Sequence, residues 1–149
     1  MKHNAVFGAP EDVDSWMALV ELSRDSFPGL EAAEAMASHR ATVEKCIARG
    51  SALCVREGGA VIGVLLFSPR LHQLSCMAVH PEYRGRGIGS VLVSRMLELV
   101  PGTVSVRTFR EGDPLGVAAR AMYAKFGFEP GELTEDNGHP GQRHILTRP

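Results

Sequence analysis

Apolar residues in the first third of the chain follow helical spacing. One stripe consists of Val13, Trp16, Met17 and Val20. Steps of three and four residues place these side chains on one face of a helix, and Asp12 directly before them is a typical N-cap. A short strand is expected before it, over residues 4–8. A second helix is predicted over residues 31–49, because Gly50 is a typical C-terminal cap, and Phe27-Pro28-Gly29 separates the two helices.

Two β-rich runs follow the helices. They cover residues 52–56 and 61–67, with Gly58-Gly59 between them. Both glycines tolerate the positive φ of a type I′ turn, so the pattern predicts a hairpin. The second run is almost wholly apolar, which is typical of a central strand covered on both faces. We expect a third strand over residues 72–79, antiparallel to its neighbour.

The second half of the chain alternates helix and strand. A helix over residues 88–100 is followed by a strand over 103–108, so the strands on either side of that helix should be parallel, as in a βαβ unit. A last helix is predicted over 115–126 and a closing strand over 143–147. The expected fold class is α/β (an α+β mixed sheet): one domain, residues 1–149, with a mixed, mostly antiparallel central sheet and helices on both faces.

Composition and charge narrow the class of protein. With 149 residues, of which 44% are hydrophobic and 22% charged, the chain is typical of a globular domain. The net charge of −1 favours neither nucleic acid nor an anionic membrane as a partner. The longest apolar stretches are too short for a membrane span, and the first residues lead into no signal-peptide core. A cytoplasmic location is therefore expected.

The cysteines and histidines show no metal-binding pattern. Cys46, Cys54 and Cys76 lie in apolar stretches without Cys-x-x-Cys spacing, so we expect buried, reduced thiols. The six histidines form no His-Glu-x-x-His arrangement and no Cys/His ligand spacing. The sequence thus predicts no metal site.

The segment from Val79 to Ser90 carries the strongest functional signal. Its glycines are Gly85, Gly87 and Gly89, and its arginines are Arg84 and Arg86. Glycine lets the backbone approach a ligand with no Cβ in the way. The unpaired N–H groups at a helix start and the positive end of the helix dipole favour an anion, to which the arginines add charge. The segment predicts a phosphate-bearing ligand at the start of the helix.

Three other interpretations of this segment fit less well. A P-loop ends in Gly-Lys-Ser/Thr, and the lysine is absent. A nicotinamide-dinucleotide fingerprint needs a third glycine where Ser90 stands, and an acidic residue that the strand 103–108 lacks. A glycine-rich turn without a ligand does not explain why two arginines flank one helix start.

Two motifs resemble those of the GNAT family of N-acetyltransferases. Arg84-x-x-Gly87-x-Gly89, preceded by Met77-Ala78-Val79-His80-Pro81-Glu82-Tyr83, resembles the family's pyrophosphate-binding motif. Ala121-Met122-Tyr123-Ala124-Lys125-Phe126-Gly127-Phe128 is similar to a second motif, in which a helix carries a tyrosine shortly before Gly-Phe. The motifs occur in the family's order, and the resemblance covers about residues 51–128. It implies a GNAT-like fold.

The resemblance also implies an activity and its residues. The chain would transfer an acetyl group from acetyl-CoA, without a metal, to a primary amine of a small molecule or peptide. The pantetheine arm would pair with the backbone of Met77, Ala78 and Val79, and the N–H of Val79 would polarise the thioester carbonyl. Tyr123 matches the tyrosine that contacts the cofactor and protonates the departing thiolate. The residues matched to pyrophosphate binding are Arg84, Gly85, Arg86, Gly87, Ile88, Gly89 and Ser90.

Departures from the family pattern leave some roles open. Many relatives place an Asn after the fifth strand to hold the cofactor, where this chain has Phe109-Arg110-Glu111-Gly112-Asp113-Pro114. Arg120 either contacts the CoA phosphates or is a solvated helix residue. No carboxylate lies on the strand that ends at Val79, where some relatives keep a general base. The candidate bases are Glu31, Glu111 and Asp113.

The acceptor is the least defined part of the prediction. In the family, the loop between the first two helices and the C-terminal strands shape its site. Here these segments carry Glu31, Glu34, Glu132, Glu135 and Asp136, so a cationic or amine-bearing acceptor is one hypothesis. A non-catalytic acetyl-CoA sensor or interaction module is the alternative function. Family members often form homodimers, although no residue here marks a contact surface.

Overall fold

A mixed β-sheet forms the centre of the molecule. The computed structural model describes residues 3–23, 33–136 and 138–149. Within them, one seven-stranded sheet has the order β1-β2-β3-β4-β5-β7-β6. The strands are β1 Val6–Phe7, β2 Ala52–Glu57, β3 Ala60–Ser68, β4 Gln73–Val79, β5 Val104–Thr108, β6 Glu129–Asp136 and β7 His139–Leu146. The pairing of β4 with β5 is parallel and the other pairings are antiparallel, which confirms the predicted mixed sheet.

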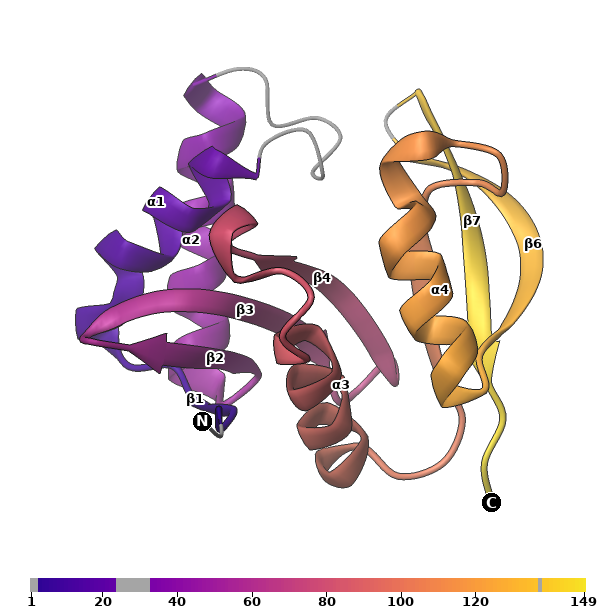
Figure 1. Cartoon of the computed structure of the whole chain (residues 1–149), viewed down its shortest axis with the longest axis horizontal. Helices are drawn as coiled ribbons and strands as arrows, with labels where there is room; N and C mark the ends of the chain where they lie inside the picture. The colour runs from indigo at the N-terminus through magenta and orange to yellow at the C-terminus, as the bar shows by residue number, and fades with distance from the viewer. Residues whose placement is uncertain (1–2, 24–32, 137) are drawn as a thin grey trace.

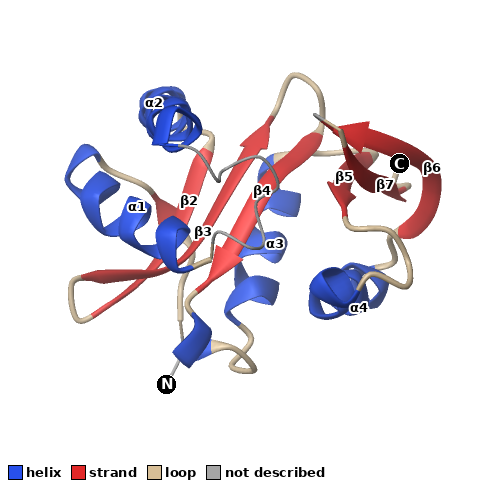
Figure 2. Cartoon of the chain, turned by 90° about the horizontal axis from the view of Figure 1, so that it is seen from above, coloured by secondary structure: helices blue, strands red, loops and turns tan. Residues whose placement is uncertain are grey.

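Helices cover both faces of this sheet. They are α1 Val13–Leu22, α2 Ala33–Arg49, α3 Ile88–Leu99 and α4 Val117–Phe126, with short 3-10 turns η1 Pro10–Asp12, η3 Pro81–Tyr83 and η4 Pro114–Gly116. Figure 2 shows α1 and α2 on one side of β2–β4 and α3 on the other. In Figure 1, α4 lies along β7, beside the half of the sheet formed by β5–β7. The molecule therefore has two halves, which meet where β4 adjoins β5.

Two apolar clusters hold the layers together. The cluster under α1 and α2 includes Trp16, Val20, Val43, Val64 and Leu66. The cluster under α3 and α4 includes Leu65, Leu92, Met96, Val106 and Tyr123. Strand β3 supplies side chains to both, and residues 61–67 are buried throughout, as predicted for a strand covered on both faces. Burying each such side chain contributes about 1.5–3 kcal/mol, so β3 anchors both layers.

Glycines end several elements as the sequence predicts. Gly58 and Gly59 connect β2 to β3 with φ of +59° and +82°, as a type I′ turn requires. Gly50 follows α2 with φ +74°, and Gly127 ends α4 with φ +98°. The segment Phe27-Pro28-Gly29 lies outside the described residues.

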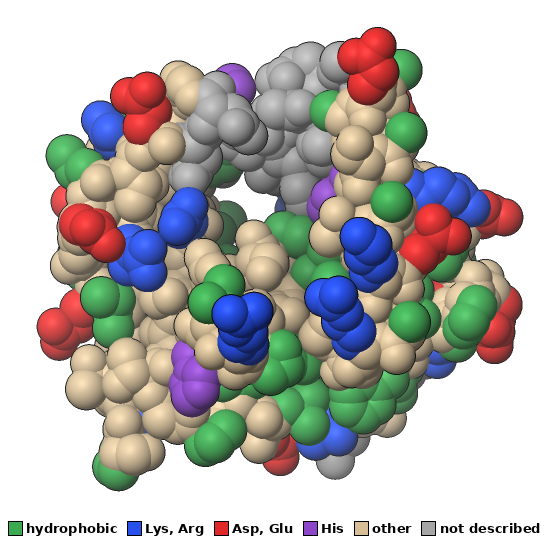
Figure 3. Space-filling model, turned by 180° about the vertical axis from the view of Figure 1, so that it is seen from behind, with side chains coloured by type: hydrophobic (Ala, Val, Ile, Leu, Met, Phe, Trp, Pro, Cys, Tyr) green, Lys and Arg blue, Asp and Glu red, His purple; other side chains and the backbone are tan. Residues whose placement is uncertain are grey.

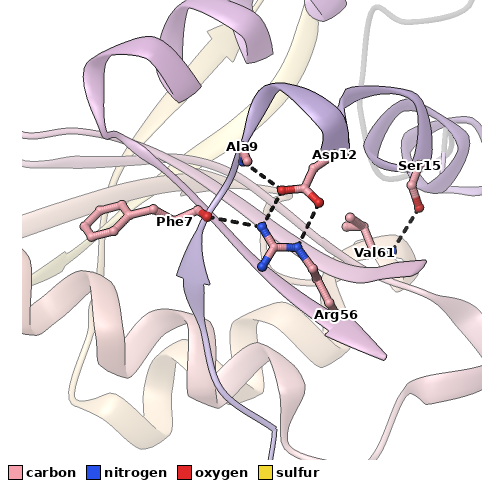
Figure 4. A network of polar contacts seen from close by, with 6 residues as sticks. All are labelled: Phe7, Ala9, Asp12, Ser15, Arg56 and Val61. Carbon is pink, nitrogen blue, oxygen red and sulfur yellow. Dashed lines mark hydrogen bonds and ion pairs between the residues drawn. The ribbon is translucent and has the colours of Figure 1, made fainter. Parts of the chain in front are cut away.

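Asp12 precedes α1 as predicted, but its carboxylate does not cap that helix. It accepts hydrogen bonds from the Ala9 N–H at 2.7 Å and from Nε of Arg56 at 2.8 Å, with a second bond from the same guanidinium (Figure 4). Arg56 is on β2, 44 residues away in the sequence. The side chain thus ties the start of α1 to the sheet, which local spacing could not reveal.

Strand β6 is an element that the sequence analysis missed, and β7 begins at His139 rather than near Arg143. The segment Glu129–Asp136 contains Pro130, Gly131 and several acids, which are uncommon inside strands. An edge strand tolerates them because its outer backbone groups face solvent. The register of β6 on β7 shifts between Pro130 and Leu133, where this irregular sequence is accommodated.

Candidate active site

A cleft opens where β4 separates from β5. The two strands pair at Gln73 with Ser105 and at Leu74 with Val106, and within residues 33–136, which the structure describes, their ladder ends there. On its other edge β4 pairs with β3 through Leu74 and then Cys76, so Ser75 is an inserted residue. Such a bulge bends a strand. The resulting cleft has a volume of about 790 Å³, within the range of small-molecule sites.

The backbone of β4 presents hydrogen-bonding groups to this cleft. The N–H of His80 donates to the Ile62 carbonyl of β3 at 2.8 Å. Backbone groups alternate in direction along an antiparallel strand, so those of Val79 and Met77 point away from β3, toward the cleft. By the same alternation, the backbone groups of Ala78 point toward β3. The side chains of Met77 and Val79 pack against the apolar cluster under α3 and α4.

The glycine loop closes one end of the cleft. Gly85 and Gly87 have φ of +78° and +80°, and Gly87 is the N-cap of α3. A Cβ on Gly63 of β3 would lie 2.6 Å from Cγ2 of Ile88, so this glycine lets the first turn of α3 rest against the sheet. The first N–H groups of a helix have no partner within it and favour an anion, so this turn is suited to receive one. The loop residues on the cleft lining are Arg84, Gly85, Gly87, Ile88, Gly89 and Ser90.

Arg86 is held by aromatic and acidic neighbours instead of lining the cleft. Its guanidinium lies 5.0 Å from the centre of the Tyr83 ring, a cation–π contact. A hydrogen bond to Glu57 raises the pKa of the Tyr83 hydroxyl and lowers that of the Glu57 carboxyl. Glu57 also lies 3.4 Å from Nε2 of His3. Through Tyr83, the end of β2 therefore fixes the loop that precedes α3.

Tyr123 lies in the wall of the cleft on α4. Its side chain is only 4% exposed, and it is the buried residue of α4. Its ring packs 5.5 Å from the ring of Phe128. Burial raises the pKa of the Tyr123 hydroxyl, and the nearby Cys76 thiol adds to this. The hydroxyl therefore remains protonated at neutral pH and can act as a proton donor.

The far wall of the cleft consists of residues that sequence reasoning did not select. Ser23, the C-cap of α1, lines it together with His39 and Thr42 of α2, Arg107 of β5 and His139 of β7. Burial lowers the pKa of His39. Their roles depend on contacts between distant segments, so no local motif identifies them. Seen from behind, the molecule is hollowed, and among the side chains drawn in colour, basic and histidine ones lie nearer the hollow than acidic ones (Figure 3).

The acidic residues predicted near the acceptor do not line this cleft. Glu34, Glu132 and Glu135 lie elsewhere, as do the candidate bases Glu111 and Asp113. Glu31 falls outside the described residues. In the described part of the chain, no carboxylate belongs to the cleft lining.

Arg120 holds the backbone after β5 together. Its guanidinium donates to the Phe109 carbonyl at 3.2 Å and to the Asp113 carbonyl at 2.7 Å. These contacts indicate a structural role for Arg120, which is neither the binding of CoA phosphates nor that of a solvated helix residue.

The described residues contain neither a cluster of metal ligands nor a disulfide. Among the described residues, no three His, Cys, Asp or Glu side chains come close enough together to hold a metal ion. The three cysteines are free thiols; Cys54 is buried as predicted, whereas Cys46 and Cys76 are only partly buried. No helix in the described ranges has the length and apolarity needed to cross a membrane.

The sequence matches a family model over most of its length. Residues 16–128 match the acetyltransferase (GNAT) family. A comparison with curated proteins finds no significant match.

Solved structures share the fold over nearly the whole chain. An acetyltransferase of the GNAT family from Bacillus cereus ATCC 10987 is 22% identical, with 99% of each chain covered and a TM-score of 0.75. The yncA protein of Salmonella typhimurium, solved with its cofactor acetyl-CoA, is 15% identical, with 99% of this chain and 94% of that chain covered and a TM-score of 0.76. The paia N-acetyltransferase of Thermoplasma acidophilum, solved with coenzyme A, is 16% identical, with 99% and 100% covered and a TM-score of 0.72.

Proposed function

The chain belongs to the acetyltransferase (GNAT) family, and we propose that it transfers the acetyl group of acetyl-CoA directly to a primary amine, with Tyr123 as the general acid. The observation that carries the proposal is the cleft between β4 and β5. Three features lie on the wall of this cleft: the start of α3, which is suited to an anion, the outward-facing backbone groups of β4, and a buried tyrosine. A donor with a diphosphate, an amide-bearing arm and a thioester fits these three features in turn.

The proposed binding mode uses backbone more than side chains. The diphosphate lies on the N–H groups of the glycine loop and the first turn of α3, with Arg84 adding positive charge. The pantetheine amides pair with the outward-facing groups of Met77 and Val79, as a neighbouring strand would. The N–H of Val79 is the candidate donor to the thioester oxygen, whose negative charge grows during attack.

The reaction balances with one proton moved from nitrogen to sulfur. The amine nitrogen attacks the thioester carbon, and a C–N bond forms while charge collects on the oxygen. The C–S bond then breaks and Tyr123 donates its hydroxyl proton to the departing thiolate. A free thiol has a pKa of about 8.5, below that of a phenol, so this transfer depends on the buried site that holds both groups together. The proton lost by the amine returns to Tyr123.

Calorimetric titration with CoA, combined with a thiol-release assay on a broad amine panel, tests this function. We expect CoA to bind, NAD not to bind, and at least one amine to release CoA from acetyl-CoA with formation of its acetyl amide. Binding of CoA without transfer to any amine would support the sensor or interaction module instead. Binding of NAD in place of CoA would contradict the family mechanism altogether.

A further inference from the structure

The turn-side end of the β6–β7 hairpin, residues 134–136 and 138–141, is called the hairpin tip here, and it forms part of the cleft wall. His139, Pro140 and Gly141 line the cleft. In Figure 1 the hairpin tip lies at the same end of the molecule as the end of α1 and the start of α2, and α3 lies nearer the opposite end. Under the proposed function the diphosphate binds at the start of α3, so the hairpin tip faces the acceptor and not the diphosphate.

The hairpin tip extends past the strand that supports the rest of β7. Within the residues that the structure describes, the ladder between β5 and β7 ends at the pair of Thr108 and Gln142. The next residue toward the turn is Gly141, which pairs with Thr134 of β6. A hairpin of two strands is only marginally stable in water without a third strand or another packed element. A tip that serves as a wall of the cleft therefore needs a contact that replaces the missing part of β5.

Arg110 supplies such a contact from the segment that follows β5. Its Nε donates a hydrogen bond to the Gly141 carbonyl at 3.0 Å, and its Nη2 donates to the Thr134 carbonyl at 2.9 Å. These two residues are paired across the hairpin, so one guanidinium ties both strands of the tip to the end of β5. The planar guanidinium presents its donors in a fixed fork, which the single ammonium of lysine cannot reproduce. Arg110 is half-buried and does not belong to the cleft lining, so it acts on the cleft through the hairpin.

The segment that carries Arg110 is itself fixed to α4. The Asp113 N–H donates to the Arg110 carbonyl at 3.0 Å. Arg120 of α4 donates to the carbonyls of Phe109 and Asp113, which lie on either side of Arg110 in the sequence. Helix α4 also carries Tyr123. A continuous series of hydrogen bonds therefore connects the helix of the proposed general acid with the hairpin tip.

We infer that Arg110 is a positioning residue for the acceptor, which holds the hairpin tip in place as a wall of the acceptor end and thereby sets the selectivity among amines. The inference rests on the proposed acetyl transfer and adds to it a residue that touches neither acetyl-CoA nor the acceptor. A wall held in one position admits amines of one shape, whereas a loosened wall binds its best acceptor less well and discriminates less between acceptors.

Arg110→Ala in the full chain tests this role with four acceptors: spermidine, kanamycin, L-lysine and glycylglycine. For the best of them, we expect the acceptor KM to rise about fivefold or more, with kcat and the KM for acetyl-CoA changed by less than about twofold. The ratio of kcat/KM between the best and the second-best acceptor should fall about threefold or more. An inactive fraction of enzyme lowers every rate equally, so a purely structural defect leaves this ratio unchanged. Arg110→Lys, which keeps the charge without the fork, should give intermediate values.

Arg148→Ala is the matched control, because it also removes a guanidinium that holds backbone carbonyls. Arg148 donates to the Gly102 carbonyl at 2.9 Å, to the Leu97 carbonyl at 3.0 Å and to the Val100 carbonyl. These residues lie at the end of α3 and beyond it, and none of them belongs to the described cleft lining. The control should lower the melting temperature and leave both the acceptor KM and the ratio between acceptors unchanged.

The outcomes separate this inference from the proposed function. An unchanged acceptor KM and ratio in Arg110→Ala, or the same changes in Arg148→Ala, would overturn the inference and leave the acetyltransferase assignment intact. Absence of CoA binding by the wild type would instead remove the proposed function, and the inference with it.

Hydrogen exchange provides a measurement that needs no turnover. If CoA binds and none of the four amines is acetylated, the exchange of amides 138–146 in the CoA-loaded protein decides. Faster exchange there in Arg110→Ala, and not in Arg148→Ala, would support the inference, and any other pattern would overturn it. If Arg110→Ala does not fold, Arg110→Lys replaces it in both measurements, with the same outcomes for and against.

Discussion

A Cβ placed on Gly89 would lie 2.9 Å from the Sδ atom of Met122. The first turn of α3 and the middle of α4 therefore meet at a position where no side chain fits between them. Met77 of β4 approaches the same point, with its Cε 3.7 Å from that Cβ. Gly89 thus allows α3, α4 and β4 to meet at the cleft, in addition to leaving the helix N–H groups accessible.

Gly89→Ala should raise the KM for acetyl-CoA several-fold, because the new methyl group pushes Met122 into the cleft that both residues line. The methionine side chain is flexible, so the fold should tolerate the change with a small loss of stability. Steady-state kinetics on Gly89→Ala, Met122→Ala and the double variant measure the effect. The double variant should recover most of the lost affinity, and a simple sum of the two single effects would contradict this packing explanation.

Gly87→Val should raise the KM for acetyl-CoA sharply and lower the melting temperature. No atom lies within 4 Å of the missing Cβ, so the defect comes from the φ of +80° and not from a clash. A β-branched residue at such a φ costs on the order of 1–3 kcal/mol. Gly87→Asn is the matched control, since asparagine tolerates this region and should keep most of the affinity. Unchanged kinetics in Gly87→Val would contradict binding of the diphosphate at this loop.

The elements marked by local signals could be predicted from the sequence. Glycines at the ends of α2 and α4 and in the β2–β3 turn set boundaries within the chain, and the unbroken apolar run of β3 indicated a strand buried on both faces. Strand β6 gave no such signal, because an edge strand on β7 can contain Pro130 and acidic residues. Its existence depends on pairing with β7, which no local pattern encodes.

The two ends of the site also differ in how far the sequence could predict them. The diphosphate end is a continuous loop and helix start, so Arg84 to Ser90 could be identified by their spacing. The acceptor end combines α1, α2, β5 and β7, and His39 and Arg107 come together there only in the folded chain. Acidic residues counted around residues 27–34 and along the C-terminal segment therefore suggested a cationic acceptor, whereas the described residues of the cleft lining are basic or neutral.

Tyr123→Phe should lower kcat at least tenfold and leave the KM for acetyl-CoA nearly unchanged, since the ring keeps its packing against Phe128 and only the proton donor is lost. Tyr83→Phe is the comparison, because the chain has two tyrosines and the second contacts Arg86 near the glycine loop. It should alter the KM for acetyl-CoA more than kcat. An unchanged kcat in Tyr123→Phe would mean that another group, or solvent, protonates the thiolate.

The pH profile gives a second test of the same residue. Burial raises the pKa of the Tyr123 hydroxyl above its ordinary value of 10.0, so the acid form persists through neutral and moderately alkaline pH. Between pH 7 and 10, deprotonation of Tyr123 should therefore cause no fall in kcat. Any decline of kcat in the wild type over this range should also occur in Tyr123→Phe. A wild-type decline centred near pH 8 that disappears in the variant would contradict the raised pKa.

Asp12→Asn should destabilise the protein by about 2 kcal/mol at pH 7, because it breaks a largely buried ion pair and leaves the Arg56 guanidinium without its partner. The Asp12 side chain is 7% exposed and that of Arg56 is 36% exposed, so solvent weakens the effect relative to a fully buried pair. Urea unfolding measures the difference in the free energy of unfolding. Asp14→Asn is the control and should change little, since the Asp14 side chain is 90% exposed and pairs with Arg40 at the surface.

The same pair gives the stability of the wild type a pH dependence of known sign. The hydrogen bond from Arg56 lowers the pKa of Asp12 below its ordinary value of 3.8. A carboxyl group with a lowered pKa stabilises the fold above its ordinary pKa, and this contribution is lost as pH falls through the lowered value. The gap between wild type and Asp12→Asn should therefore be full at pH 7 and shrink as the pH falls below 3.8 toward the lowered pKa of Asp12. A gap that stays constant down to pH 2 would show that the asparagine acts through packing and not through the lost charge.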